Sequence, residues 1–529
     1  MGMSQETRRR RVGFVAALAL GGAMVPVTAA AQTAQTGCER RNNNHYEKLL
    51  ECVTLEGVRE HQAALQAIAD ANGGTRADQT PGYTASVDYV VATMEAAGWE
   101  VERVPFTYAG ADVVLQQLTP ASATFVANPA TGTGEGDVTA QVVPVDIVLG
   151  GDRQNTSGCE PADFAGFPAG SIALIQRGGC NFSFKAINAE AAGAAAAILF
   201  NQGDTIGAGD RFGPLNPTLG GEDVVDIPTV GTSFDAGVSL AQAGSTARVS
   251  VDFVDRVSEN VIAELPGRND DNVVMAGAHL DSVPAGPGIN DNGSGSAVLL
   301  EIAQNLGRHR PENTVRFAWW GAEELGLIGS TAWVESLSDE ELDRIALYLN
   351  FDMVGSPNHI FMVYDANESS FVAPAPVPPG SEAIEATFES YYTLAGVPYD
   401  DTAFSGRSDY QAFINNGIPS SGLFTGAEQV KTPLQQSIWG GTAGAQFDPC
   451  YHLACDTYAN NNDEALAVNA DAVAFAVMTF SASTESVNGV PGRRIPGGFE
   501  IPAPAGPEHT FAGPLGGDHD DHDHGPVAS

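Results

Sequence analysis

Two histidines and three carboxylates in this sequence are of the types that bind a transition metal together. They are His279, Asp291, Glu324, Asp352 and His452. Imidazole nitrogen and carboxylate oxygen are usual ligands of Zn²⁺. One catalytic zinc takes three protein ligands and a water, so five ligands are too many for one such ion. They fit two ions if one carboxylate bridges them.

Two further acidic residues stand beside these ligands. Asp281 follows His279 by two positions, so on a strand both side chains point to the same face. A carboxylate there can accept the second ring N–H of a ligating histidine and fix its tautomer. Glu323 directly precedes Glu324, and adjacent side chains diverge, so we expect Glu323 to act as a general base on water.

Each of these residues taken alone has an ordinary explanation. A single histidine at the end of a strand is more often a hydrogen-bonded polar residue than a ligand. We accept that interpretation for His45, His61, His309 and His359. The pair Glu323–Glu324 differs because it closes an apolar run, where buried acids need a partner charge.

The elements that position these residues are predicted to be strands of an α/β sheet. Apolar runs suited to buried strands are "NVVMAGAHLD", "TVRFAWWGAEE" and "ALYLNFDMVG". Each carries a histidine or an acid at or near its carboxyl end, where open α/β sheets bind ligands. We predict a mixed, mostly parallel central sheet flanked by helices.

The first part of the chain predicts two helices and a strand. Residues 45–71 have apolar residues at spacings of three and four. The segment "TASVDYVVATMEAAG" predicts a second helix, with Thr84 or Ser86 as its cap and Gly98 just past its end. "WEVERVPFTY" alternates and predicts a strand.

Between about 113 and 253 the sequence changes to short strands and turns. Predicted strands are "ATFVANP", "AQVVPVDIV", "SIALIQRG", "AAAILFNQG", "DIPTVGTS" and "ARVSVDFV". One alanine-rich helix interrupts them. We predict a β-rich module inserted into a larger domain.

Charge and the first residues of the chain bear on where it acts. The net charge is -40, which disfavours binding to nucleic acid. A basic stretch, an apolar stretch and "AAA" predict a signal peptide over 1–31, and hence a secreted, periplasmic or extracellular protein. No other run of apolar residues is long enough to span a bilayer, so we expect no membrane partner after cleavage.

The six cysteines fit an oxidising compartment. They fall in three local pairs, Cys38–Cys52, Cys159–Cys180 and Cys450–Cys455, one of about 15 connectivities. The spacing needed for a cysteine-only zinc site is absent. The end of the chain, 489–529, is rich in Pro, Gly, Asp and His and predicts disorder.

Five motifs together carry a resemblance to a family. "GAHLDSV…GINDNGSG", "WWGAEELGLIGS", "LNFDMVGSPN", "FSGRSDY" and "CYHLACD" resemble the successive motifs of the secreted di-zinc aminopeptidases of the bacterial leucine aminopeptidase type. The inserted module resembles a protease-associated domain. The resemblance implies a discontinuous zinc peptidase domain over 38–112 and 254–488, around a protease-associated domain over 113–253.

The resemblance also implies roles for the residues. His279 and Asp352 would hold one zinc, Glu324 and His452 the other, and Asp291 would bridge them. The Asp291–Asn292 peptide would be cis, and Cys450–Cys455 would stiffen the loop that carries His452.

Other residues would serve the substrate. Tyr451 would donate to the oxyanion, although a packed aromatic is the alternative. Arg407 would bind substrate or product, although an ordinary ion pair is the alternative, and Phe424 would line the side-chain pocket. The substrate would be the N-terminus of a peptide, with a large apolar first residue, and the enzyme a monomer.

Three other functions remain open from the sequence. A carboxypeptidase of the same fold would need basic residues in the pocket, and this chain has few. A glutaminyl-cyclase-like enzyme would use one zinc. A non-catalytic binding protein should have lost ligands or the base, and neither is lost.

Overall fold

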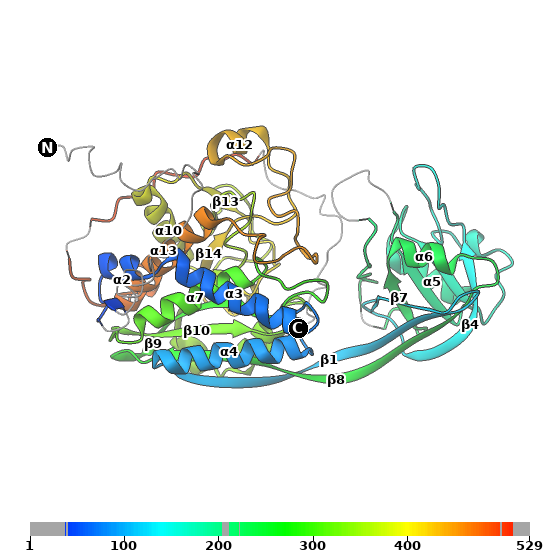
Figure 1. Cartoon of the computed structure of the whole chain (residues 1–529), viewed down its shortest axis with the longest axis horizontal. Coiled ribbons are helices and arrows are strands. Elements are labelled where there is room, and N and C mark those ends of the chain that lie inside the picture. Colours follow the sequence, from blue (N-terminus) through cyan, green and yellow to red (C-terminus); the bar gives the residue numbers. More distant parts are fainter. Residues whose placement is uncertain (1–36, 39–40, 204–210, 222, 498–499, 512–529) are drawn as a thin grey trace, which may run out of the picture. The chain divides into compact units, whose positions relative to one another are not determined.

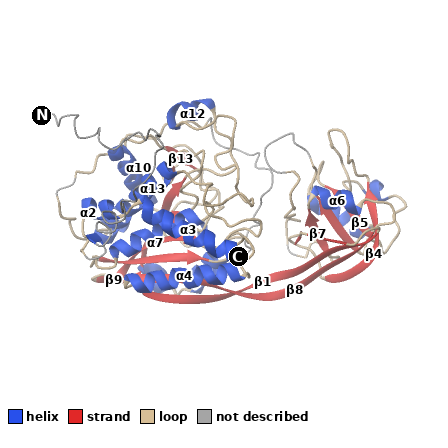
Figure 2. Ribbon diagram, viewed as in Figure 1, coloured by secondary structure: helices blue, strands red, loops and turns tan. Residues whose placement is uncertain are grey.

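The computed structural model describes residues 37–38, 41–203, 211–221, 223–497 and 500–511. The predicted signal peptide over 1–31 lies outside them. Within them the chain is a mixed α/β protein, as predicted. Figure 1 follows the chain by colour and Figure 2 separates helices from strands.

The half of the sheet that carries the predicted ligands is mostly parallel. Its strands are β9 (Asn269–His279), β10 (Asn313–Trp320), β11 (Ile345–Phe351), β12 (Met362–Tyr364), β13 (Asp400–Thr402) and β14 (Ser420–Phe424). Their order in the sheet is β13-β12-β14-β11-β9-β10. β9 pairs in parallel with both β10 and β11, and β11 pairs in parallel with β14. The carboxyl ends of these four strands therefore meet at one edge.

Helices cover both faces of these strands. One apolar core contains side chains from the first group of helices, which are α2 (Tyr46–Cys52), α3 (Leu55–Ala71), α4 (Pro81–Ala97), α7 (Gly293–Leu306), α10 (Ser381–Ala395) and α13 (Asp463–Ala482). A second core contains side chains from α8 (Ile328–Ser336), α9 (Asp339–Arg344) and α11 (Tyr410–Asn415). Alternate strand residues supply the two cores, with Phe317 and Trp319 in the first and Ala318 and Trp320 in the second. The short helices α12 (Pro433–Trp439) and α14 (Glu485–Asn488) complete this part.

Two long strands connect the ligand-bearing strands to the inserted module. β1 (Glu100–Thr119) and β8 (Thr246–Leu265) are antiparallel partners along their length. The end of β8 pairs with β10, and its beginning pairs with β4. The module adds β2 (Ala123–Phe125), β3 (Ala127–Pro129), β4 (Gly136–Val145), η1 (Pro161–Phe164), β5 (Ile172–Gln176), α5 (Phe182–Ala191), β6 (Ala196–Phe200), β7 (Thr229–Thr232) and α6 (Phe234–Leu240).

The helix predicted over 45–71 is two helices in the structure. The chain turns at Val53 and Thr54, and the Thr54 side chain accepts a hydrogen bond from Gly57 N as the cap of α3. The cap predicted for α4 was wrong. Thr80 caps this helix and Pro81 occupies its first turn, because proline has no N–H to lose there. Gly98 ends α4 with a φ of 86°, as predicted.

Part of the segment for which the sequence predicts disorder has defined contacts. Thr510 donates from N and Oγ to Asp400, and Phe511 packs against Phe371. Buried Asp400 needs such donors, which residue composition alone does not reveal. Within the predicted tail, residues 498–499 and 512–529 lie outside the described residues.

Among the described helices, α13 is the one long and apolar enough to span a membrane. Of the most apolar 18-residue stretch of this helix, 72% is buried inside the protein. Its residues Val473, Phe475 and Val477 belong to the first apolar core, which explains its hydropathy.

Disulfides occur both in the inserted module and outside it. Cys159 pairs with Cys180 in the inserted module, and Cys450 pairs with Cys455 in the loop that carries His452, as predicted. Cys38 and Cys52 are also disulfide-bonded.

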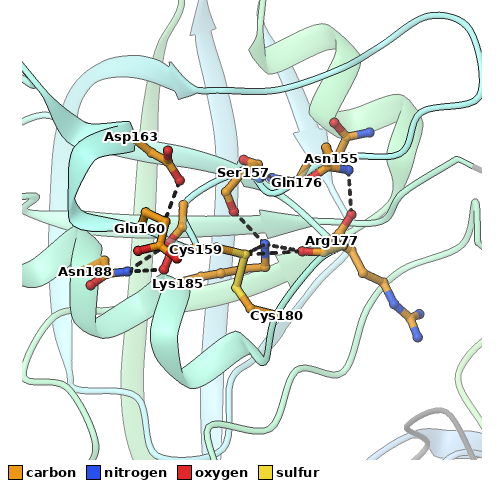
Figure 3. Close-up of a disulfide and its surroundings, with 12 residues drawn as sticks. Asn155, Ser157, Cys159, Glu160, Asp163, Gln176, Arg177, Cys180, Lys185 and Asn188 are labelled. Carbon is orange, nitrogen blue, oxygen red and sulfur yellow. Dashed lines mark hydrogen bonds between the residues drawn. A yellow bond between two sulfur atoms is a disulfide. The ribbon is translucent and has the colours of Figure 1, made fainter.

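A buried lysine lies against the disulfide of the inserted module (Figure 3). Lys185 Nζ donates to Ser157 O at 2.5 Å and to Gly178 O at 2.7 Å, and it lies 3.6 Å from Cys159 Sγ. Lys185 is fully buried, and burial lowers the pKa of its ammonium to about 8. The side chain therefore joins two loops by satisfying their buried carbonyls.

Replacing this lysine should destabilise the module. We expect Lys185→Met to lower the free energy of unfolding by about 2 kcal/mol, because two buried carbonyls lose their donor. Urea denaturation measures the change. Lys48→Met on α2, where the side chain is partly exposed, is the control and should change little. Equal losses in the two variants would contradict the structural role.

Candidate metal centre

The strand ends deliver the predicted ligands to one place. His279 is the last residue of β9, Asp352 directly follows β11, and Glu324 lies shortly after β10. Asp291 precedes the start of α7, and His452 lies in the loop closed by Cys450–Cys455. Sequence segments more than 170 residues apart therefore meet at the carboxyl edge of the sheet.

Asp291 lies between the two histidines. Its Oδ1 is 3.1 Å from His279 Nε2, and its Oδ2 is 3.3 Å from His452 Nε2. A second carboxylate lies within 3.4 Å of each of these two Nε2 atoms. His279 Nε2 is 3.4 Å from Asp352 Oδ1, and His452 Nε2 is 3.0 Å from Glu324 Oε2.

The donors are close enough to share cations. One ligand atom each from His279, Glu323 and Asp352 lies within 4.8 Å of the others, and the same holds for His279, Asp291 and Glu324. Two buried oxygens in this group, Glu324 Oε1 and Asp352 Oδ1, have no hydrogen-bond partner among the described residues. Buried carboxylate oxygens without a donor fit a metal centre well.

The local charge also favours a cation. Burial opposes protonation of His452, but Glu324 and Asp291 outweigh it and raise the pKa of this ring to about 10. Burial raises the pKa of Glu323 well above its ordinary value, with the Asp352 carboxylate acting in the same direction. The centre thus holds more carboxylate than its two imidazoles can neutralise.

Asp281 contacts both a histidine ligand and the turn that carries the two glutamates. His279 Nδ1 is 3.2 Å from the backbone O of Asp281 and 3.6 Å from its Oδ1. The Asp281 carboxylate also accepts from the backbone N of Glu323 at 3.2 Å and of Glu324 at 3.3 Å. It is therefore placed to hold both the histidine ring and the two-glutamate turn.

The close packing that brings these elements together requires small residues. A Cβ added to Gly295, in the first turn of α7, would lie 2.1 Å from Phe351 O at the end of β11. The Asn292 side chain caps the same turn by accepting from Gly295 N. The peptide bond between Asp291 and Asn292 is cis, as the resemblance implies.

Arg407 and Tyr451 form one network beside the centre. Arg407 Nη1 contacts Glu428 Oε1 at 2.7 Å, and its Nη2 donates to the Tyr451 hydroxyl at 3.0 Å. The Tyr451 ring stacks on His452, with centroids 3.8 Å apart. Phe424 ends β14 and packs against apolar side chains, among them Met362 and Phe447.

Residues outside the predicted set support the ligands. Asp456 accepts from the backbone N of Asn290 at 2.9 Å and of Asp291 at 3.0 Å. Ser408 Oγ donates to Asp352 Oδ2 at 2.7 Å. Asp456 is the last residue of the "CYHLACD" motif, so its proximity to a ligand in the sequence was the available signal.

Arg76 is the most extensively bonded supporting residue that was absent from the predicted set. It is fully buried and donates from its side chain to the backbone O of Leu280, of Pro287 and of Gly288, all in the loop between His279 and Asp291. Burial lowers its pKa to about 10, while Asp281, Asp456 and Asp291 favour its charge. It sits in a polar loop of the sequence, where an exposed arginine is the ordinary expectation.

Removing Arg76 should disrupt the ligand loop. We expect Arg76→Met to lower the free energy of unfolding by about 3–5 kcal/mol, because it leaves buried acids and carbonyls without a partner. Arg76→Lys keeps the charge but cannot donate to all three backbone carbonyls. The free energy of unfolding should therefore fall less than in Arg76→Met. Thermal denaturation measures both.

Arg103→Met provides the control for this comparison. Arg103 pairs with Asp88 and Glu259 and its side chain is 37% exposed, so the loss should be about 1 kcal/mol or less. If Arg76→Met cost no more than Arg103→Met, Arg76 would not hold the loop.

Comparison with known proteins agrees with this architecture. Residues 260–477 match peptidase family M28, and residues 138–240 match the PA domain. Both ranges lie inside the domains that the sequence predicts.

Whole-chain relatives extend the match. An aminopeptidase of Pseudomonas aeruginosa is 49% identical over 448 residues, covering 83% of each chain. Leucine aminopeptidase 2 of Trichophyton rubrum is 45% identical over 333 residues, covering 62% of this chain and 65% of that one. The structure of BSAP, a zinc aminopeptidase from Bacillus subtilis, matches with a TM-score of 0.63 at 26% identity, covering 81% of this chain and 95% of that one. The chain therefore belongs to peptidase family M28 and carries an inserted PA domain.

Proposed function

We propose that this chain is a secreted zinc aminopeptidase that removes the N-terminal residue of peptides. The observation that carries the proposal is the position of Asp291, whose two carboxylate oxygens face two different histidines, each with its own further carboxylate. The aminopeptidase and zinc aminopeptidase names of the relatives give the activity class.

Two zinc ions are part of the proposal. His279 and Asp352 would hold one, Glu324 and His452 the other, and Asp291 would bridge them, so that each ion has three protein ligands. The ions would supply Lewis-acid chemistry, activating water and polarising the scissile carbonyl.

Glu323 is proposed as the general base. Its side chain is buried, its Oε2 is 3.9 Å from His279 Nε2, and its backbone N is held by Asp281. Its raised pKa suits a group that takes a proton from the attacking water and returns it to the leaving amine.

Tyr451 and Arg407 would act together on the developing oxyanion. Arg407 donates to the oxygen of the Tyr451 hydroxyl, so the hydroxyl hydrogen is available for another acceptor. A substrate carbonyl that gains negative charge would be such an acceptor. Phe424 is proposed for the side-chain pocket, and carboxylates at the centre would receive the free α-amine of the substrate.

Glu323→Gln tests the base. We expect peptide hydrolysis to fall about 10²–10⁴-fold, because proton transfer is lost while the shape of the side chain is kept. Zinc content, measured by mass spectrometry of metals, should not change. Glu335→Gln, on the exposed side of α8, is the control. Activity of Glu323→Gln close to wild type would remove Glu323 from the mechanism.

Metal stoichiometry tests the assignment of ligands. We expect two zinc ions per wild-type chain and about one in His452→Ala, because the other ion keeps His279, Asp291 and Asp352. His45→Ala, where the side chain makes no capping bond, should keep two. One zinc in the wild type would favour a cyclase-like centre, and none would favour a non-catalytic binding protein.

Substrates separate the activity classes. We expect hydrolysis of leucyl-nitroanilide and of other apolar aminoacyl-nitroanilides, and a loss of activity when the α-amine is acetylated, because an acetylated amine carries no charge for the carboxylates. Release of C-terminal residues from N-acetylated peptides would instead identify a carboxypeptidase.

Location and assembly complete the proposal. The disulfides and the residues 1–31 of the sequence support export, and the net charge of -40 supports a partner other than nucleic acid. We propose that the exported enzyme works as a monomer free of the membrane.

A further inference from the structure

A second group of buried carboxylates lies away from the candidate metal centre and shares no residue with it. Glu385 and Glu389 are one turn apart on α10, and Asp401 lies in the edge strand β13. One carboxylate oxygen from each of the three lies within 4.8 Å of the others. Asp365, directly after β12, acts on all three as a nearby negative charge.

One buried carboxylate oxygen of this group has no hydrogen-bond donor in the part of the chain that the structure describes. Asp401 is fully buried, and its Oδ1 has no hydrogen-bond partner among the described residues. Its Oδ2 accepts from the hydroxyls of Ser369 and Ser370. An acceptor buried without any donor costs free energy unless a proton or a cation supplies the missing partner.

Neighbouring donors fix the orientation of this group. Glu385 accepts from the backbone N and the side-chain amide of Asn367, at 3.0 and 2.9 Å, which fixes its orientation. Asp365 accepts from the backbone N of Ser369, Ser370 and Phe371, which anchors the same loop. No arginine or lysine forms an ion pair with the three carboxylates among the pairs found in the described residues.

The electrostatics of this group also favour a bound cation. Burial, together with the charges of Glu389 and Asp401, raises the pKa of Glu385 to about 9. Burial and Asp401 raise the pKa of Glu389 to about 7. Three buried carboxylates that disfavour one another's charge would be stabilised by a divalent ion in their midst.

We infer that Glu385, Glu389 and Asp401 form a structural site for a hard divalent cation of the calcium type. All the donors are oxygens, which calcium prefers, and the set contains no nitrogen or sulfur that would favour zinc. The ion would join α10 to the edge strand β13 and to the loop after β12. It would stabilise the fold and take no part in hydrolysis.

Calcium chloride and the zinc-loaded full-length protein provide the test. Isothermal titration calorimetry should detect one calcium per chain, and Tm should rise by several degrees as calcium is added, because a ligand that binds only the folded state stabilises it. The zinc content should remain constant throughout, which separates this site from the catalytic ligands.

Two near-isosteric variants locate the site. In Glu389→Gln and Asp401→Asn the calcium concentration at half-maximal Tm shift should increase by about tenfold or more, because each removes one of three charged ligands. Glu389→Gln should be at least as stable as wild type without calcium, since it removes a like charge. Glu382→Gln, on the same helix but exposed, is the matched control and should respond as wild type.

Three results would overturn the inference. The first is a wild-type protein with no calcium heat and no Tm shift, which would mean that the carboxylates share protons instead. The second is an unchanged calcium response in both Glu389→Gln and Asp401→Asn. The third is a calcium response accompanied by loss of zinc, which would place the calcium at the catalytic ligands. None of these depends on whether the proposed peptidase activity is found.

Discussion

Buried negative charge at the carboxyl edge of the sheet is the constraint on which the rest of this structure depends. Asp281, Asp291, Glu323 and Asp352 are all buried there, and their mutual repulsion must be offset. The two histidines and Arg76 supply part of the compensation from within the chain. Some carboxylate oxygens there have no hydrogen-bond donor among the described residues, which explains why this arrangement suits bound cations.

The scaffold meets this constraint with contacts that are individually ordinary. Asp281 and Asp456 each accept hydrogen bonds from two backbone N–H groups of the segments that carry other ligands, which fixes the position of those segments. The Cys450–Cys455 disulfide closes the loop of His452, the ligand with the most exposed side chain of the five. Rigid support of this kind is what a metal centre needs to keep its ligands in place.

In the inserted PA domain, a buried charged side chain also has hydrogen-bond partners within the chain. Lys185 lies among carbonyl oxygens beside a disulfide, and no carboxylate is its hydrogen-bond partner among the contacts described. Between α10 and β13 the situation is reversed, because three carboxylates lie together and no arginine or lysine forms an ion pair with them among the pairs found in the described residues. These contrasts separate groups that the protein satisfies by itself from groups that call for a bound ion.

The sequence by itself determined the fold class, the strands that carry the ligands and the disulfide of the His452 loop. Those features follow from local apolar runs and from motifs of a few residues, such as "GAHLD" and "CYHLACD". It did not determine the roles of Arg76 and Asp456, the cap of α4 or the docking of Thr510. These depend on partners that are 100 or more residues away or, for α4, on a choice among nearby caps. The motifs assigned Asp291 as the bridge by resemblance, but its distances to the two imidazoles were decided only by the tertiary structure, because three strand ends and a distant loop must meet before either oxygen has a neighbour.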